Sequence, residues 1–217
     1  MYEKKSTILF QGDSITDGGR SRDNDLNHVM GHGYAYLIAA KLGAKMPERE
    51  LRFINRGCSG HQVSDLYARW QEDTINLAPD LISILIGIND IGAEVNRNAG
   101  IGPEKYERTY QLLLEDVLVA LPQAQLVLCE PFILPVGDKL ERWDEWKPKV
   151  DNLQKIVGRL AAKYGAVNVP FQEVLEDACS RAKAEYWLWD GIHPTPAGHE
   201  LLAGAWLNAV NEKNSSR

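Results

Sequence analysis

Hydrophobic positions along the chain form short continuous runs, separated by longer stretches with helical spacing. Buried strands of a parallel sheet give such runs, because helices cover both faces of the sheet. A buried helix segment would give them too, but the runs are short and several are rich in β-branched residues with turn residues after them. The alternation predicts an α/β fold built on a parallel sheet. The five runs are Thr7–Phe10, Leu51–Ile54, Leu81–Ile86, Leu126–Leu128 and Ala166–Val169.

Three of the longer stretches place their apolar residues on one helical face. Each carries a terminus signal, which is a proline in the first turn, a glycine after the last turn or a threonine as N-cap. Such stripes are core far more often than they are sites, so we interpret all three as core. They are Pro103–Leu121, Val150–Tyr164 ahead of Gly165, and Pro196–Trp206 after Thr195.

Two segments are predicted as loops longer than connections normally are. Residues 15–32 are polar and rich in glycine, and residues 131–148 contain Trp143 and Trp146. Long loops in compact domains tend to be functional, and ligands of open α/β sheets bind beyond the carboxyl ends of the strands. We expect the first loop at that edge. The two tryptophans would either wall the site or pack against a neighbouring subunit, which leaves a homo-oligomer open.

Composition narrows the class of protein. The 217 residues suit one α/β domain, predicted to span residues 1–217. A hydrophobic fraction of 44% and a charged fraction of 25% exclude a disordered, collagen-like or coiled-coil protein. With 24 Lys and Arg against 30 Asp and Glu, a net charge of −6 and no basic run, the surface repels phosphate backbones. No nucleic-acid partner is expected.

The N-terminal segment and the cysteines exclude further classes. The first ten residues have too few apolar side chains for a secretory signal or a membrane span, so we expect a cytoplasmic protein without a membrane partner. Cys58, Cys129 and Cys179 lack the C-x-x-C spacing, which indicates neither a zinc site nor a disulfide framework. No metal and no cofactor are predicted.

Four short stretches carry candidate chemistry, and three of them directly follow predicted strands. A serine hydroxyl needs a base to attack a carbonyl, and the base needs an orienting carboxylate. The tetrahedral oxyanion needs preorganised donors, such as backbone N–H groups at glycine and an asparagine amide. Taken together, the stretches supply the parts of a serine acyl-transfer site. They are Gly12–Thr16, Asn55–Gly60, Gly87–Asp90 and Asp190–Pro194.

Each stretch alone has a simpler interpretation. Gly12–Thr16 is compatible with an ordinary strand-to-helix turn in which Asp13 accepts backbone N–H groups. Gly87–Asp90 is compatible with a plain turn, and a single histidine before a proline is usually a surface or core residue. Their conjunction, in this order and at three successive strand ends, indicates a site.

This set of stretches resembles the SGNH hydrolases, the GDSL-type esterase/lipase superfamily. The resemblance covers about residues 8–205, and no block is missing. It implies a three-layer α/β/α sandwich around a five-stranded parallel sheet, flavodoxin-like in architecture. The residues that match the four letters of the family name are Ser14, Gly57, Asn89 and His193.

The resemblance also implies a role for each of these residues. Ser14 would be the nucleophile, His193 the general base, and Asp190, three residues before it, the orienting acid. The oxyanion hole would consist of the Ser14 N–H, the Gly57 N–H and the Asn89 side-chain amide. The activity implied is that of a serine esterase that forms an acyl-enzyme.

A finer resemblance is to the intracellular carbohydrate acetylesterases that deacetylate xylo-oligosaccharides. It implies a small-molecule ester substrate, an acetylated oligosaccharide, with Arg20 and Trp189 as candidate substrate contacts. The alternatives for these two are a solvated loop arginine and a core tryptophan that supports the histidine loop. The residues behind this resemblance are Thr16–Arg20, Arg22, Gly33-Tyr34, Arg69-Trp70 and Trp189-Asp190.

Two other functions stay open at this point. A lysophospholipase or thioesterase of the same superfamily would need an apolar groove for a long acyl chain, whereas residues 15–32 are polar. A flavodoxin-like phosphate-binding module would suit the glycines of residues 12–19. A P-loop, however, needs a glycine where Asp17 stands and a lysine directly after it. A short-chain esterase is therefore the leading hypothesis.

Overall fold

The computed structural model describes residues 2–23 and 25–215, and its centre is a five-stranded sheet in the order β2-β1-β3-β4-β5. All four pairings are parallel. Each predicted run is a strand with its ends within two residues of the expected ones, so the predicted α/β fold is confirmed. The strands are β1 (Thr7–Gly12), β2 (Arg52–Asn55), β3 (Leu81–Leu85), β4 (Gln125–Cys129) and β5 (Val167–Val169).

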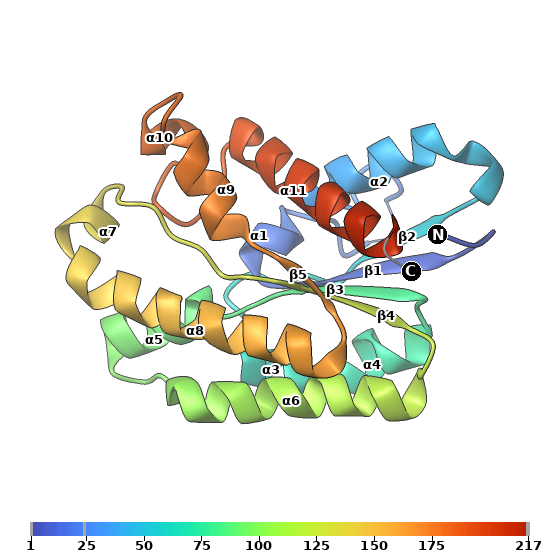
Figure 1. Cartoon of the computed structure of the whole chain (residues 1–217), viewed down its shortest axis with the longest axis horizontal. Coiled ribbons are helices and arrows are strands. Elements are labelled where there is room, and N and C mark those ends of the chain that lie inside the picture. Colours follow the sequence, from blue (N-terminus) through green and yellow to red (C-terminus); the bar gives the residue numbers. More distant parts are fainter. Residues whose placement is uncertain (1, 24, 216–217) are drawn as a thin grey trace.

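Helices cover both faces of the sheet, as Figure 1 shows. On one face lie α2 (Tyr34–Lys45), α9 (Phe171–Ala178) and α11 (Pro196–Ser215). On the other lie α3 (Val63–Ala68), α4 (Trp70–Asp73), α5 (Ile88–Arg97), α6 (Gly102–Ala120) and α8 (Trp143–Tyr164). Short helices and 3₁₀ turns complete the chain: α1 (Ser14–Asp17), η1 (Pro47–Arg49), η2 (Ile75–Leu77), α7 (Asp138–Glu141) and α10 (Ala184–Trp187).

The three predicted helices form, and their stripes are core. The apolar side chains that α6 and α8 turn toward the sheet are buried, as are Leu202 and Trp206 of α11. Gly165 ends α8 in the left-handed conformation, with φ of 64°. The Thr195 hydroxyl accepts a hydrogen bond from the Gly198 N–H at 3.2 Å, which confirms the predicted N-cap.

The prediction of one long loop over residues 131–148 is wrong. Its second half is helical, because α7 begins at Asp138 and α8 begins at Trp143. Trp146 is 1% exposed, so it cannot supply a subunit contact. Pro148 suggested a loop, but here it is accommodated inside α8. Packing of the helix's apolar face outweighs the one backbone donor that proline lacks.

The loop after β1 is shorter than expected, since residues 14–17 form α1 and the irregular part begins at Gly18. The carboxyl ends of the strands point to the left of Figure 1, where α1, α5, α7 and α10 gather. No helix in the described parts of the chain is both long and apolar enough to cross a lipid bilayer.

Candidate active site

Strand register brings three of the four candidate stretches to one edge of the sheet. Phe10 of β1 pairs with Asn55 of β2, and Gly12 pairs with Leu85 of β3. The segments that follow these strands therefore emerge side by side. They carry Ser14 at the start of α1, the loop of residues 56–62, and Asn89 in the first turn of α5. The fourth stretch reaches the same edge from the segment before α11.

Ser14, His193 and Asp190 form a continuous chain of hydrogen bonds. The Ser14 Oγ lies 2.9 Å from the His193 Nε2, and the His193 Nδ1 lies 2.7 Å from the Asp190 Oδ2. The other Asp190 oxygen, Oδ1, accepts the backbone N–H groups of Ile192 at 2.9 Å and of His193 at 2.7 Å. Residues 179 positions apart in the sequence thus meet at hydrogen-bond distance.

The electrostatics of this chain suit a base and its orienting acid. The hydrogen bond that the His193 ring donates to Asp190 raises the pKa of His193 above 6.5, against the smaller opposing effect of burial. Burial alone would raise the pKa of Asp190, but the hydrogen bonds from the His193 ring and from two backbone N–H groups outweigh it and lower the pKa to about 2. Asp190 is therefore a carboxylate at neutral pH, a charge suited to stabilising an imidazolium at His193.

Asp13 holds the serine turn in place. Its Oδ1 accepts the Ile15 N–H at 3.0 Å and so caps α1. The carboxyl is buried, its Oδ2 has no hydrogen-bond partner, and burial raises its pKa to about 7. The neighbouring Gly12 has no room for a side chain, because an added Cβ would lie 2.3 Å from the Leu85 carbonyl oxygen. The turn therefore depends on a glycine and a capping aspartate in front of Ser14.

Two of the three expected oxyanion donors are available. The Asn89 Nδ2 donates one hydrogen bond to the His61 carbonyl oxygen at 3.1 Å, which fixes the amide and leaves its second N–H free. Ser14 is the first residue of α1, so its backbone N–H has no acceptor within the helix. Nor does any acceptor elsewhere in residues 2–23 and 25–215 take it.

The structure contradicts Gly57 as the third donor. Its N–H already donates to the Asn55 Oδ1 at 2.9 Å, and the residue is buried. An added Cβ would lie 2.3 Å from the Asp17 backbone nitrogen, so close packing explains this glycine. Gly60, three residues on, is exposed, has φ of 82° and lines the cleft beside His193. The sequence analysis assigned the donor to the first glycine of the stretch, whereas the second glycine, Gly60, lines the cleft.

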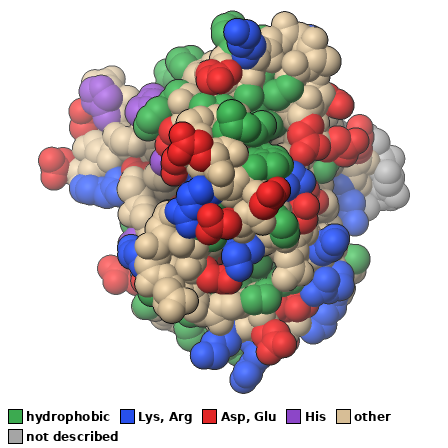
Figure 2. Space-filling view, turned by 90° about the vertical axis from the view of Figure 1, so that its left-hand side faces the viewer, with side chains coloured by type: hydrophobic (Ala, Val, Ile, Leu, Met, Phe, Trp, Pro, Cys, Tyr) green, Lys and Arg blue, Asp and Glu red, His purple; other side chains and the backbone are tan. Residues whose placement is uncertain are grey.

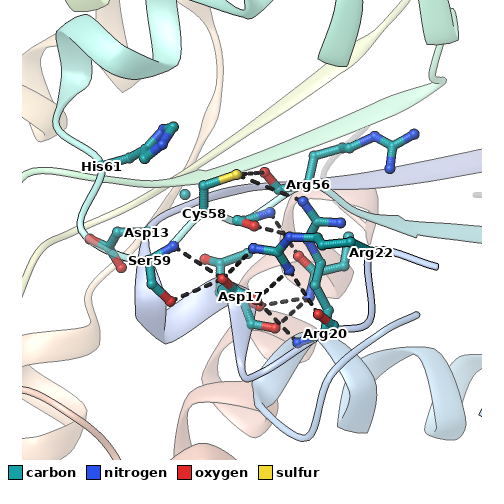
Figure 3. Close-up of polar contacts among 12 residues, drawn as sticks. Asp13, Asp17, Arg20, Arg22, Arg56, Cys58, Ser59 and His61 are labelled. Atoms are coloured by element: carbon teal, nitrogen blue, oxygen red, sulfur yellow. Dashed lines mark hydrogen bonds and ion pairs between the residues drawn. The ribbon is translucent and has the colours of Figure 1, made fainter. Parts of the chain in front are cut away.

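Arginines and Asp17 support the loop that carries Gly60 (Figure 3). Asp17 accepts both Arg22 Nη groups, at 3.0 and 2.7 Å, and the N–H and hydroxyl of Ser59 at 3.1 and 3.0 Å. Burial raises the pKa of Asp17, but these bonds outweigh it and lower the pKa to about 2. Arg20 donates from Nε to the Gly57 carbonyl oxygen at 2.9 Å. The guanidinium of Arg20 therefore contacts the loop, whereas the sequence suggested that it contacts the substrate.

A cleft of about 360 Å³ opens beside the hydrogen-bonded chain. Trp189 is 63% exposed and its ring stacks on that of His193, with centroids 5.6 Å apart, so it is no core residue. Trp146 is buried in the wall of the cleft, as one of the two alternatives for it predicted. The lining includes Gly60, Asn89, Lys139, Trp146, Ile192 and His193.

The surface around this edge carries mixed charge. Figure 2 views the molecule from this side and shows acidic and basic side chains interspersed around a central group of hydrophobic ones. Among the described residues, no three His, Cys, Asp or Glu side chains cluster closely enough to hold a metal ion. The groups gathered at the cleft are a hydroxyl, an imidazole, a carboxylate and hydrogen-bond donors, which is a set that can transfer an acyl group.

Comparison with known proteins gives consistent matches over nearly the whole chain. Residues 10–201 match the model of the GDSL-like lipase/acylhydrolase family. The chain is 32% identical to the acetylxylan esterase of Geobacillus stearothermophilus over 210 residues, which cover 94% of this chain and 93% of that protein. The crystal structure of a catalytic mutant of an acetylxylan esterase from the same organism has a TM-score of 0.86, 30% identity, and coverage of 97% of this chain and 96% of that one. A protein from Parabacteroides merdae, described as a GDSL-like lipase, has a TM-score of 0.93 and 36% identity, with coverage of 97% and 98%.

Proposed function

The chain belongs to the GDSL-like lipase/acylhydrolase family and is a carboxylic ester hydrolase, and from that premise we propose that it removes acetyl groups from carbohydrates such as xylo-oligosaccharides. One observation carries the catalytic part of the proposal. The Ser14 Oγ lies 2.9 Å from the His193 Nε2, and Asp190 holds the opposite ring nitrogen at 2.7 Å. This geometry presents a hydroxyl with a base already oriented toward it.

The acylation step follows from this arrangement. The Ser14 Oγ attacks the ester carbonyl carbon while its proton passes to the His193 Nε2. The carbonyl oxygen becomes an oxyanion, which the N–H groups of Ser14 and Gly60 and the free N–H of Asn89 stabilise. As the intermediate collapses, the carbon–oxygen bond to the sugar breaks, and His193 returns its proton to the departing sugar oxygen. Ser14 is left as an acetyl ester.

Deacylation repeats the chemistry with water as the nucleophile. His193 removes a proton from water, whose oxygen attacks the acetyl carbonyl carbon, and the same three donors stabilise the second oxyanion. The bond from the carbonyl carbon to the Ser14 Oγ then breaks, and Ser14 takes the proton back from His193. Acetic acid leaves and ionises at neutral pH. No cofactor or metal enters these steps.

Support for a carbohydrate acetyl ester comes from the relatives and from Trp189. Two of the three relatives named above are acetylxylan esterases, and each match covers nearly the whole chain. The exposed Trp189 ring stacks on His193, which lines the cleft, and its flat aromatic face can stack on a sugar ring. We assign Trp189 to substrate binding on this basis. Arg20, which donates to the Gly57 carbonyl, we assign to support of the loop. The association of this protein into a homo-oligomer stays a prediction.

The test compares substrates and a variant of the nucleophile. Wild type is expected to deacetylate acetylated xylo-oligosaccharides and to hydrolyse p-nitrophenyl acetate faster than p-nitrophenyl octanoate. Ser14→Ala should lose both activities while it unfolds at the temperature of wild type. A preference for the octanoate would reject the acetyl specificity and favour a lysophospholipase or thioesterase. Turnover that survives in Ser14→Ala would reject the mechanism.

A further inference from the structure

His61 connects two parts of the oxyanion site. It follows Gly60 directly, and its carbonyl oxygen accepts the hydrogen bond that fixes the Asn89 amide, at 3.1 Å. On its other side, the His61 Nδ1 lies 3.2 Å from the Arg69 Nε. The ring is half-buried, and Figure 3 shows it apart from the cluster around Asp17. One residue therefore connects Gly60 and Asn89 to an arginine outside the cleft.

The contact with Arg69 determines the tautomer of His61. An arginine Nε always carries a hydrogen and has no lone pair to offer, so the His61 Nδ1 must be the acceptor. The ring proton of neutral His61 then resides on Nε2. Burial first, and the charge of Arg69 second, lower the pKa of His61 below 6.5. The neutral ring that this contact needs is thus the dominant form at neutral pH.

Arg69 extends the connection to the strand that carries the nucleophile. Its Nη1 donates to the Gln11 Oε1 at 2.9 Å, and its Nη2 lies 3.4 Å from the Gly12 carbonyl oxygen, so it contacts the end of β1 just before Ser14. Nη1 also pairs with Asp73, one turn further along the chain, at 2.9 Å. The side chain is 15% exposed, so solvent competes little for these contacts.

We propose that Arg69 and His61 act together as positioning residues that set the spacing between Ser14 and the oxyanion donors Gly60 and Asn89. This rests on the proposed function, because it assigns the pair to the transition state of the same reaction. Oxyanion donors act only within about 2.7–3.1 Å of the developing charge. A displacement of about 1 Å can lower the rate by about a hundredfold.

Other contacts among the described residues hold the same loop, but none of them joins the residue after Gly60 directly to β1. Ser59 bonds to Asp17 on one side of Gly60, and the Val63 N–H donates to Asp90 at 3.2 and 3.3 Å on the other. Neither reaches β1. Arg69 alone among these groups contacts both the strand before Ser14 and the residue after Gly60. A change in the pair is therefore expected to act on the reaction more than on the fold.

Two variants at His61 distinguish the effect of losing the hydrogen-bond acceptor from the effect of losing the volume of the ring. His61→Asn places an amide oxygen near the position of Nδ1, whereas His61→Leu has a similar volume and no acceptor. Arg69→Met keeps the stem of the side chain and removes its donors. We expect His61→Leu and Arg69→Met to lower kcat for p-nitrophenyl acetate by about ten- to a hundredfold, with KM within about twofold, since the lost interaction acts in the transition state.

The remaining variants provide rescue and controls. His61→Asn should keep kcat within about threefold of wild type, and the double variant of His61→Leu and Arg69→Met should be no slower than either single one, within about threefold. Arg159→Met removes a pair with Glu107 of which neither residue lines the cleft, so it should leave kcat unchanged. Melting temperatures are measured for every variant.

Several outcomes would overturn the proposal. A kcat equal to that of wild type in both His61→Leu and Arg69→Met would do so. So would a kcat of His61→Asn as low as that of His61→Leu, or losses in kcat that add in the double variant. If His61→Leu fails to fold, Arg69→Met gives the same comparison from the other side of the contact. Ser14→Ala is assayed alongside. If it stays active, the proposed function itself fails; if it is inactive while the pair has no effect, only this inference fails.

Discussion

Replacing Asp190 with asparagine is expected to abolish most of the activity without unfolding the protein. The change replaces one oxygen by an NH₂ group and removes one negative charge. Asp190 Oδ1 accepts two backbone N–H groups, from Ile192 and His193, and Oδ2 accepts the His193 Nδ1–H. The outcome therefore depends on which of these two positions the amide oxygen of Asn takes.

The backbone decides this orientation. With the oxygen at the Oδ1 position, both backbone N–H groups stay bonded and the NH₂ group faces the His193 Nδ1. The reverse orientation would leave two N–H donors facing an NH₂ group, at about 1–3 kcal/mol for each lost partner. The first orientation makes Nδ1 an acceptor, so the ring hydrogen moves to Nε2 and faces the Ser14 Oγ. In that tautomer His193 cannot take the serine proton.

The expected loss is about 10⁴-fold in kcat, the effect known for the wrong tautomer in a serine protease triad. It corresponds to about 5.5 kcal/mol in the activation free energy. The assay is hydrolysis of p-nitrophenyl acetate at saturating substrate, together with a thermal melt. A folded Asp190→Asn enzyme with kcat within about tenfold of wild type would refute the assignment of Asp190 as the orienting acid.

The remaining predictions concern the donors, the base and the loop. Asn89→Ala is expected to lower kcat about a hundredfold while Ser14 still reacts with a fluorophosphonate probe, and an unchanged kcat would remove Asn89 from the oxyanion hole. Because Asp190 raises the pKa of His193 above 6.5 and the base must be neutral, kcat/KM should fall as pH drops through a value above 6.5; a pH profile with its acid midpoint at or below 6.5 would contradict this. Gly57→Ala is expected to destabilise the fold by about 1–3 kcal/mol in a denaturant titration, because its Cβ would meet the Asp17 backbone; full stability with a selective loss of kcat would instead return Gly57 to the oxyanion hole.

Local patterns were enough to predict the strands and the greater part of three long helices, and they indicated which side chains would meet at the candidate site. The five apolar runs are the strands. The clearest runs belong to the central strands β1, β3 and β4, because burial on both faces leaves little choice of residue in a parallel sheet. Ser14, Asn89 and the stretch from Asp190 to His193 follow strands or precede a helix, where their type and spacing already indicate acyl transfer. An acyl-transfer site requires the serine, the histidine and the carboxylate to be hydrogen-bonded to one another. In the structure Ser14, His193 and Asp190 are bonded in this way.

Only the tertiary structure decided which of two glycines in one stretch is free to bind a ligand. Gly57 and Gly60 look alike in sequence, but Asn55 takes the N–H of the first, while the second lies open beside the cleft. The sequence also could not show the contact of Arg69 with His61, nor decide between the two alternatives for Trp146. A sequence pattern reports which side chains prefer burial or a turn, whereas hydrogen-bond partners are distributed among residues that meet only when the chain folds.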